Sequence, residues 1–158
     1  MAAAPLSESP IHGNTHWQRV AALGLALAEG DPDIDYELVV LFAMTHDAMR
    51  SDDGRDPDHG HRAVPFVRHL GLALGTDRLA RLCVAVARHS LGETTTDPTI
   101  GACWDADRLD LYRLGVFPRH DLLSTARADT SEMRGRARAL QVAPPTWEAI
   151  FASFAGRS

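Results

Sequence analysis

Apolar residues recur at intervals of three and four along almost the whole chain, and this helical periodicity constrains the fold more than any other feature of the sequence. It predicts helices over residues 16–29, 35–49, 59–74, 77–91, 98–114 and 147–155, with a weaker segment within 119–140. Clusters of glycine, proline and aspartate separate these segments, and no segment reads convincingly as a β-strand. We therefore expect an all-α protein, a compact single-domain bundle of about six to seven helices.

Polar residues mark two of the expected helix starts. Thr76 and Asp97 each stand at the beginning of a periodic segment, where a side-chain oxygen can accept a hydrogen bond from the first helical turn. Pro98 follows Asp97, and proline is favoured at a first helical position. We expect both Thr76 and Asp97 to act as helix N-caps.

The size of the chain predicts one domain. Its 158 residues are 45% hydrophobic, which is enough to bury a substantial core. We expect a flexible N-terminus over residues 1–10 and a single helical domain over residues 11–158. The longest apolar runs are too short to span a membrane, and the N-terminus lacks the basic start and apolar stretch of a signal peptide, so we expect a cytoplasmic protein without a membrane partner.

The basic residues exclude several classes of function. All sixteen are arginines, which rules out enzymes that use a lysine Schiff base or the lysine of a P-loop. The formal net charge is -5, and the one basic cluster, Arg134, Arg136 and Arg138, is typical of a solvated helix face. A nucleic-acid polymer is therefore not an expected partner, while a monomer and a homodimer both remain open.

One apolar segment ends in a histidine and an aspartate, His46 and Asp47. The residues before them are apolar on nearly every helical face, and burying an imidazole and a carboxylate there costs several kcal/mol unless something compensates them. A bound cation is one such compensator. Because successive residues of a helix project about 100° apart, one ion near the last turn can contact both side chains.

Other histidines and aspartates supply further candidate ligands. Asp107 shares an apolar helical stripe with Cys103, Leu111 and Leu114, so its carboxylate needs a partner. By contrast, Asp105 and Asp110 are expected to point elsewhere, with Asp110 paired to Arg113 or Arg108. The histidines that accompany the doublet are His16, His59, His61 and His89. His12 is expected in a loop beside the site.

The candidate ligands are imidazoles and carboxylates without sulfur. Cys83 and Cys103 both fall in apolar helical segments and share no CxxC spacing, so we expect two reduced core residues. The remaining ligand types suit a divalent transition metal, namely manganese, iron, cobalt, nickel or zinc, and spacing alone does not choose among these metals.

The ordered set of motifs resembles the HD-domain superfamily of metal-dependent phosphohydrolases. The resemblance covers roughly residues 12–115, where it places the metal-site core, and a complete ordered set in an all-helical chain is specific. Its elements are His16 ahead of Arg19-Val20, the doublet His46-Asp47, His59-Gly60 ahead of Arg62-Ala63, His89-Ser90, and the Ala-Asp-Arg-Leu-Asp run that contains Asp107.

The resemblance implies a ligand set. His16, His46, Asp47 and Asp107 would hold one divalent ion. In branches with two metals, His59 and His89 would hold the second ion, with Asp47 bridging. In branches with one metal, the same two histidines would instead lie near the phosphate as proton donors. One and two ions both stay open, and His61 competes with His59 for its place.

The implied activity is hydrolysis of a small phosphorylated metabolite, with a nucleotide favoured by analogy. A bound divalent ion lowers the pKa of its water toward about 7, which predicts attack of metal-bound hydroxide on phosphorus. His59 or His61 would protonate the leaving oxygen. Relatives often carry an acidic helper shortly after the doublet, a role open here to Asp52 or Asp53. The candidate phosphate-binding residues are Arg19, Arg50, Arg62, Arg88 and Arg108.

Two other classes of function fit the same residues. Some members of the superfamily use two irons at a six-ligand set and oxidise their substrate, so a di-iron oxygenase is an alternative. A non-enzymatic module that binds a metal or a ligand is the other. The number and identity of the bound ions would separate these alternatives.

Overall fold

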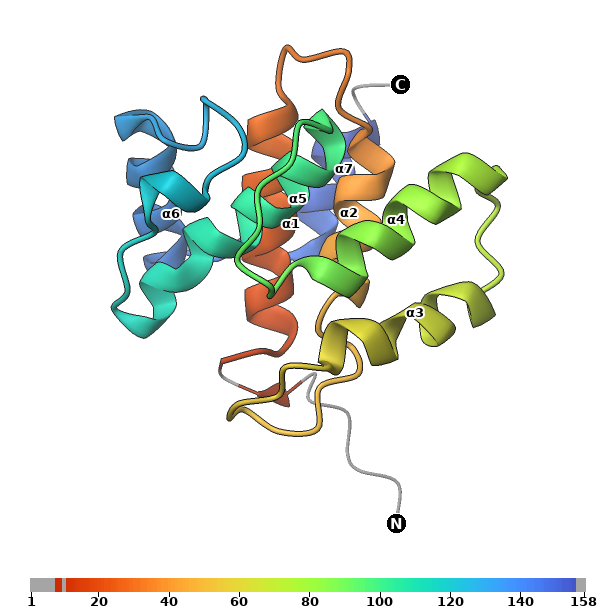
Figure 1. The fold of residues 1–158 in the computed structure, drawn as a ribbon. Coiled ribbons are helices and arrows are strands. Elements are labelled where there is room, and N and C mark those ends of the chain that lie inside the picture. The colour runs from red at the N-terminus through yellow and green to blue at the C-terminus, as the bar shows by residue number, and fades with distance from the viewer. Residues whose placement is uncertain (1–7, 10, 156–158) are drawn as a thin grey trace.

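The computed structural model describes residues 8, 9 and 11–155, and all regular structure in that range is helical (Figure 1). The expected all-α bundle of six to seven helices is confirmed. The predicted flexible N-terminus lies outside the described residues, except for Glu8 and Ser9. The helices in chain order are α1 (Asn14–Ala28), α2 (Tyr36–Thr45), α3 (His59–His69), α4 (Thr76–Arg88), α5 (Pro98–Leu109), the 3-10 helices η2 (Asp110–Leu114) and η3 (His120–Leu122), α6 (Ser131–Val142) and α7 (Trp147–Ala155).

The core of the bundle is formed by α1, α2 and α5, which pack against one another (Figure 1). On one side α4 contacts α2 and α5 and carries α3 on its outer face, while α6 and α7 contact α1. A Cβ atom on Gly24 of α1 would lie 2.3 Å from Cγ1 of Val39 on α2, so the close approach of these helices requires glycine. The antiparallel pair brings the start of α1 beside the end of α2.

Several helices end before the apolar periodicity does. The second helix ends at Thr45, and His46 is its C-cap. The third ends at His69, and α5 passes into η2 after Leu109. His46 and Asp47 after α2 and Asp110 after α5 are still buried, so the pattern of buried side chains continues past the end of these two helices.

The two predicted N-caps have different outcomes. The Asp97 carboxylate accepts a hydrogen bond from the backbone N–H of Ile100 at 2.9 Å, and Pro98 begins α5, so this cap is confirmed. The Thr76 prediction is wrong: Thr76 is the first residue of α4, and Gly75 is its N-cap without a side-chain hydrogen bond. The helix begins one residue earlier than a threonine cap would require.

Polar and sulfur-containing residues of α5 and α4 are also placed in the interior. As expected, Cys83 and Cys103 are buried and unpaired. The Asp105 carboxylate is fully buried and accepts hydrogen bonds from the backbone N–H groups of Ser124 and Thr125, which ties the loop before α6 to the core.

In the part of the chain that the structure describes, no helix is both long and apolar enough to cross a membrane.

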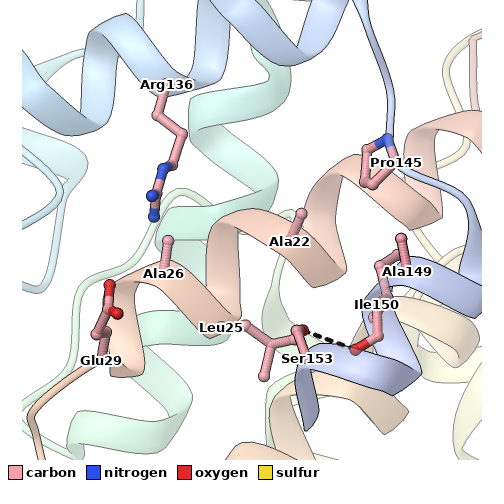
Figure 2. A pocket seen from close by; sticks show the side chains of 9 residues that line it. All are labelled: Ala22, Leu25, Ala26, Glu29, Arg136, Pro145, Ala149, Ile150 and Ser153. Carbon is pink, nitrogen blue, oxygen red and sulfur yellow. Dashed lines mark hydrogen bonds between the residues drawn. The ribbon is translucent and has the colours of Figure 1, made fainter.

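A hollow of about 210 Å³ lies between α1 and α7 (Figure 2). Figure 2 shows Ala22 and Ala26 of α1 facing it, with Arg136 of α6 near one end. Neither histidine nor cysteine occurs among the nine described residues that line it. The hollow therefore lacks the imidazole and thiolate groups that bind transition metals.

Candidate metal centre

The structure brings together all six side chains that the HD-domain resemblance implied as ligands. Five segments supply them: the first turn of α1, the end of α2, the start of α3, the C-cap of α4 and the last turn of α5. The four histidines and Asp47 are buried, and the Asp107 side chain is 20% exposed. The six residues are His16, His46, Asp47, His59, His89 and Asp107.

Four of these side chains form a first cluster, made of His16, His46, Asp47 and Asp107. The Nε2 atoms of His16 and His46 lie 3.1 Å apart. Oδ2 of Asp47 lies 3.5 Å from His16 Nε2 and 3.6 Å from His46 Nε2. Oδ1 of Asp107 lies 3.4 Å from His16 Nε2 and 3.8 Å from His46 Nε2. Two imidazoles and two carboxylates thus face a common point.

The other oxygen of Asp47 belongs to a second cluster, made of Asp47, His59 and His89. Oδ1 of Asp47 lies 3.1 Å from His59 Nε2 and 3.5 Å from His89 Nε2. The two Nε2 atoms are 2.8 Å apart. One carboxylate therefore joins the two clusters, with one oxygen in each.

The contacts of the Nδ1 atoms of three histidines indicate which ring nitrogen carries the hydrogen. Nδ1 of His46 lies 3.2 Å from the carbonyl oxygens of Phe42 and Ala43, and Nδ1 of His89 lies 2.8 Å from that of Val86. His59 Nδ1 contacts the carbonyl oxygen of Asp56. A carbonyl only accepts hydrogen bonds, so each Nδ1 donates and each Nε2 presents a lone pair to the centre.

Facing lone pairs are the strongest sign that both clusters fit a cation. At 2.8 Å the Nε2 atoms of His59 and His89 need a proton or a metal ion between them, and hydrogen bonding to Asp47 raises the pKa of His89 in spite of its burial. Ligand atoms about 2.1 Å from one ion are about 3.0 to 3.4 Å from one another, close to the separations in both clusters. The donor set and its spacing therefore fit bound divalent metal.

Asp110 supports the first cluster from behind. Its Oδ2 accepts a hydrogen bond from Nδ1 of His16 at 2.7 Å, and Arg19 donates to both carboxylate oxygens at 2.7 and 3.0 Å. Gln141 of α6 donates to Oδ1 at 2.7 Å, and the expected partner Arg113 forms an ion pair with Oδ2 at 3.6 Å. This role of Asp110 was not predicted, although Asp110 follows a predicted ligand by three positions and so lies near the same helix face.

Three of the four side chains of the first cluster have charge states that suit metal binding, while at His16 hydrogen bonds to Asp110 and Asp47 outweigh burial and raise the pKa. Burial opposes ionisation of Asp47, but the surrounding histidines, His46 foremost, hold the pKa of this carboxyl well below its ordinary value. Burial also lowers the pKa of His46 to about 4, so this imidazole is neutral at neutral pH. Burial is likewise outweighed at Asp107, whose pKa is lowered by His46, His16 and His89. The carboxylates are ionised while His46 keeps its Nε2 lone pair.

A cavity of about 300 Å³ is lined by residues of both clusters. Asp47, His59, His89 and Asp107 contribute to its wall, so a molecule in the cavity can approach the metal ligands. Apart from Ser90, the remaining wall is basic or apolar. It consists of His12, Arg50, Ser90, Gly92, Arg108, Leu111, Arg113, Leu114 and Leu122.

Two of the five predicted phosphate-binding arginines line this cavity. Nη1 of Arg50 lies 3.8 Å from Oδ1 of Asp47 and 3.4 Å from the ring nitrogens of His59, so its guanidinium is beside the second cluster. Arg108 also lines the wall. Arg113, which was not among the five, is a third arginine of the wall.

The other three predicted arginines have different surroundings. Arg19 is buried and engaged with the Asp110 carboxylate. Arg62 is exposed and donates to Asp56, while Arg88 donates to both carboxylate oxygens of Glu93 at 2.8 Å. Arg19, Arg62 and Arg88 do not line the cavity.

The two competing histidines of α3 are separated by the structure. His59 is buried in the second cluster, whereas His61 is exposed and lines a different surface hollow between α3 and α4. A signal for this was present in the sequence, because Ala63 and Val67 follow His59 at intervals of four and are buried with it.

The acidic candidates after the doublet also differ. The Asp52 carboxylate is exposed, accepts a hydrogen bond from the N–H of Gly54 and does not line the cavity. Oδ1 of Asp53 instead lies 3.0 Å from Nδ1 of His12, whose ring lines the cavity outside both clusters. The structure thus places His12 and Asp53 as a pair at the cavity wall.

Comparisons of this chain with protein-family models, with curated proteins and with solved structures found no match. The HD-domain resemblance therefore stays a hypothesis. What the structure shows is a buried group of histidines and aspartates that can hold metal ions beside a basic cavity.

Proposed function

We propose that this protein is a metal-dependent phosphohydrolase of the HD-domain type, which holds two divalent ions and hydrolyses a small phosphorylated metabolite. The carboxylate of Asp47 is the observation that carries this proposal. Its two oxygens face two separate pairs of histidines, at 3.1 to 3.6 Å. A carboxylate shared in this way is the arrangement expected of a two-metal site.

The cavity supports an anionic substrate. Three arginines line it against two aspartates, before the charge of any metal is counted. Arg50, beside the second cluster, is placed to hold phosphoryl oxygens, since a planar guanidinium binds them through two parallel hydrogen bonds. Divalent ions in the clusters would supply an activated water and offset negative charge on the phosphoryl group.

The proton for the leaving oxygen is better supplied by His12 than by His59. Both nitrogens of His59 are engaged, Nδ1 with the carbonyl of Asp56 and Nε2 with the second cluster. His12 lies outside the clusters, lines the cavity, and has its Nδ1 oriented by the Asp53 carboxylate. Burial lowers the pKa of His12, and a phosphate bound beside it would favour the imidazolium form that donates a proton from Nε2.

The test combines metal analysis with a screen for phosphate release. Protein purified without chelator or added metal is analysed for bound ions, then loaded with Mn²⁺, Co²⁺ or Fe²⁺ and incubated with sugar phosphates, phosphocarboxylates and nucleotides. We expect two ions per chain and metal-dependent release of phosphate. Asp47→Asn should lose both, while Asp52→Asn should retain both because Asp52 does not line the cavity.

A wild-type protein that binds two ions yet releases phosphate from none of these compounds would contradict the proposal. Loss of activity in both variants would also count against it, since Asp52→Asn alters an exposed loop only. Screening all three metals prevents a wrong choice of ion from being mistaken for a missing activity.

One observation favours a second candidate, a di-iron oxygenase. Each cluster contains two imidazoles and at least one carboxylate, a combination that is also typical of non-haem iron sites. Two bound irons, together with consumption of oxygen on adding a substrate and no phosphate release, would favour this function. Tight binding of metal or ligand without turnover would instead identify a binding module.

A further inference from the structure

Arg108 is a buried cation without a carboxylate partner among the described residues. It directly follows Asp107 on α5, is 7% exposed and lines the cavity. Nη1 donates to the carbonyl oxygen of Leu122, and Nη2 donates to that of Glu93. The Glu93 carboxylate is turned to Arg88 instead. Arg108 therefore donates its hydrogen bonds to neutral carbonyl groups and forms no ion pair with a described carboxylate, although Asp105, Asp107 and Glu93 attract it from farther away.

This arrangement leaves hydrogen-bonding capacity unused. A guanidinium has five N–H donors, and the two bonds to Leu122 and Glu93 use two of them, which leaves three. Burial lowers the pKa of Arg108, as expected for a cation withdrawn from water. Such a charge is costly unless an anion reaches it.

The side chain is also held in place. Its guanidinium lies over the ring of Trp104, with Cζ 5.7 Å from the ring centroid, and its two carbonyl partners come from η3 and from the loop after α4. A guanidinium fixed by three different segments is preorganised, so binding an anion costs little side-chain entropy.

Arg50 and Arg108 occupy different parts of the wall. Arg50 lies beside the second cluster, whereas Arg108 is anchored to the segments that contain Glu93 and Leu122. Among the described residues that line the cavity there is no phenylalanine, tyrosine or tryptophan. A nucleobase would therefore find none of these large aromatic rings on which to stack, and a second anion would find Arg108.

We propose that Arg108 binds a second anionic group of the substrate, a carboxylate in the simplest case, so that the substrate is a compact phosphorylated acid with two anionic ends. The position of its phosphate end at the metal clusters rests on the proposed phosphohydrolase function. Arg108 adds the selectivity for an acid over a neutral sugar phosphate or a nucleoside phosphate.

The experiment measures binding of two matched probes to protein saturated with Mn²⁺. Phosphonoacetate carries a phosphonate and a carboxylate, while ethylphosphonate is similar in size and lacks the carboxylate. Isothermal titration calorimetry compares both probes on wild type, Arg108→Gln, Arg108→Lys and Arg136→Gln. The last variant is the control, because Arg136 lines the separate hollow between α1 and α7. Thermal melting checks that each variant is folded.

Wild type should bind phosphonoacetate at least about tenfold more tightly than ethylphosphonate, as expected for one charge-assisted interaction. Arg108→Gln should lose this preference with little change in ethylphosphonate affinity, Arg108→Lys should keep part of it, and Arg136→Gln all of it. Equal affinities in wild type would overturn the proposal, whatever the stability of the variants. A preference that persists in Arg108→Gln would also overturn it.

Failure of the proposed function gives a different result. If Mn²⁺-loaded protein hydrolyses no phosphate compound but still shows the Arg108-dependent preference for phosphonoacetate, the anion site stands and the hydrolase proposal does not. If phosphate esters are hydrolysed but phosphonoacetate and ethylphosphonate bind equally, the hydrolase stands and the anion site does not.

Discussion

Gly60 of α3 packs so closely against Val86 of α4 that a Cβ atom on Gly60 would lie 2.6 Å from the carbonyl oxygen of Val86. The same carbonyl accepts the hydrogen bond from Nδ1 of His89, and Gly60 directly follows His59. The contact therefore sets the spacing of the two helices and, through it, the 2.8 Å between the Nε2 atoms of His59 and His89. Close backbone approach is the physical reason for a glycine after this histidine.

Gly60→Ala should disrupt the second cluster. The added methyl group has to displace backbone oxygens of α4, so we expect the protein to bind one ion instead of two and to lose roughly 1 to 3 kcal/mol of stability. Gly135→Ala is the matched control, because a Cβ on this helical glycine meets no described atom within 4 Å. It should keep both ions and gain up to about 1 kcal/mol. Metal analysis and urea unfolding measure both effects, and unchanged metal content in Gly60→Ala would refute the expectation.

Asp110→Asn should weaken metal binding without removing a ligand. The amide cannot accept from His16 and Arg19 as the carboxylate does, so the imidazole of His16 loses its orientation and affinity should fall about 10- to 100-fold. Leaving buried Arg19 without its counter-charge should also cost on the order of 3 kcal/mol. Gln141→Ala removes only a neutral donor from Asp110 and should have a smaller effect on both measurements. Titration with Mn²⁺ and urea unfolding measure the two effects. An Asp110→Asn protein that is indistinguishable from wild type in both measurements would contradict the prediction.

His12→Ala should lower turnover while leaving metal content intact. His12 lines the cavity but belongs to neither cluster, and a proton donor typically contributes about 10²- to 10⁴-fold to the rate. Asp53→Asn should give a milder loss, because it removes only the group that orients Nδ1. His61→Ala, on the opposite side of α3, should be silent. Initial rates of phosphate release with parallel metal analysis test this, and full activity of His12→Ala would exclude the role.

The buried, neutral His46 predicts a pH dependence in the metal-free protein. Because burial lowers the pKa of His46 from 6.5 to about 4, the unfolded chain binds a proton that the folded chain does not between these values. Its contribution to stability is complete above pH 6.5 and is lost as the pH falls toward 4. The stability difference between wild type and His46→Gln should therefore shrink by on the order of 3 kcal/mol across this window.

Urea unfolding at several pH values checks this sign and size. His61→Gln serves as the control, since His61 is exposed and its replacement should alter stability equally at each pH. A difference between wild type and His46→Gln that stays constant from pH 7 to 4.5 would contradict a buried neutral imidazole.

Much of the architecture follows from local properties of the sequence. Apolar periodicity identified the helices because one face of each must be buried, and Asp97 with Pro98 marked the start of α5 because capping involves neighbouring residues only. Helix ends were less accurate: the pattern continues through His46 and Asp47, where inward-facing side chains persist after the helix has ended.

The types of ligand were also readable from the sequence, but their arrangement was not. An apolar segment that ends in His46 and Asp47 calls for a compensating charge wherever the chain folds. That the two oxygens of Asp47 serve different histidine pairs depends on how α3 and α4 pack beside α2. No local pattern contains that information.

The sequence by itself determined an all-helical protein and a set of buried imidazoles and carboxylates, because helical propensity and the cost of burying polar groups are properties of each segment. Only the tertiary structure decided which side chains meet. Asp110 and Arg19 are 91 positions apart and pair because α5 packs on α1. Arg108 faces the cavity while Arg19 does not, since side-chain direction depends on the rotation of each helix against its neighbours.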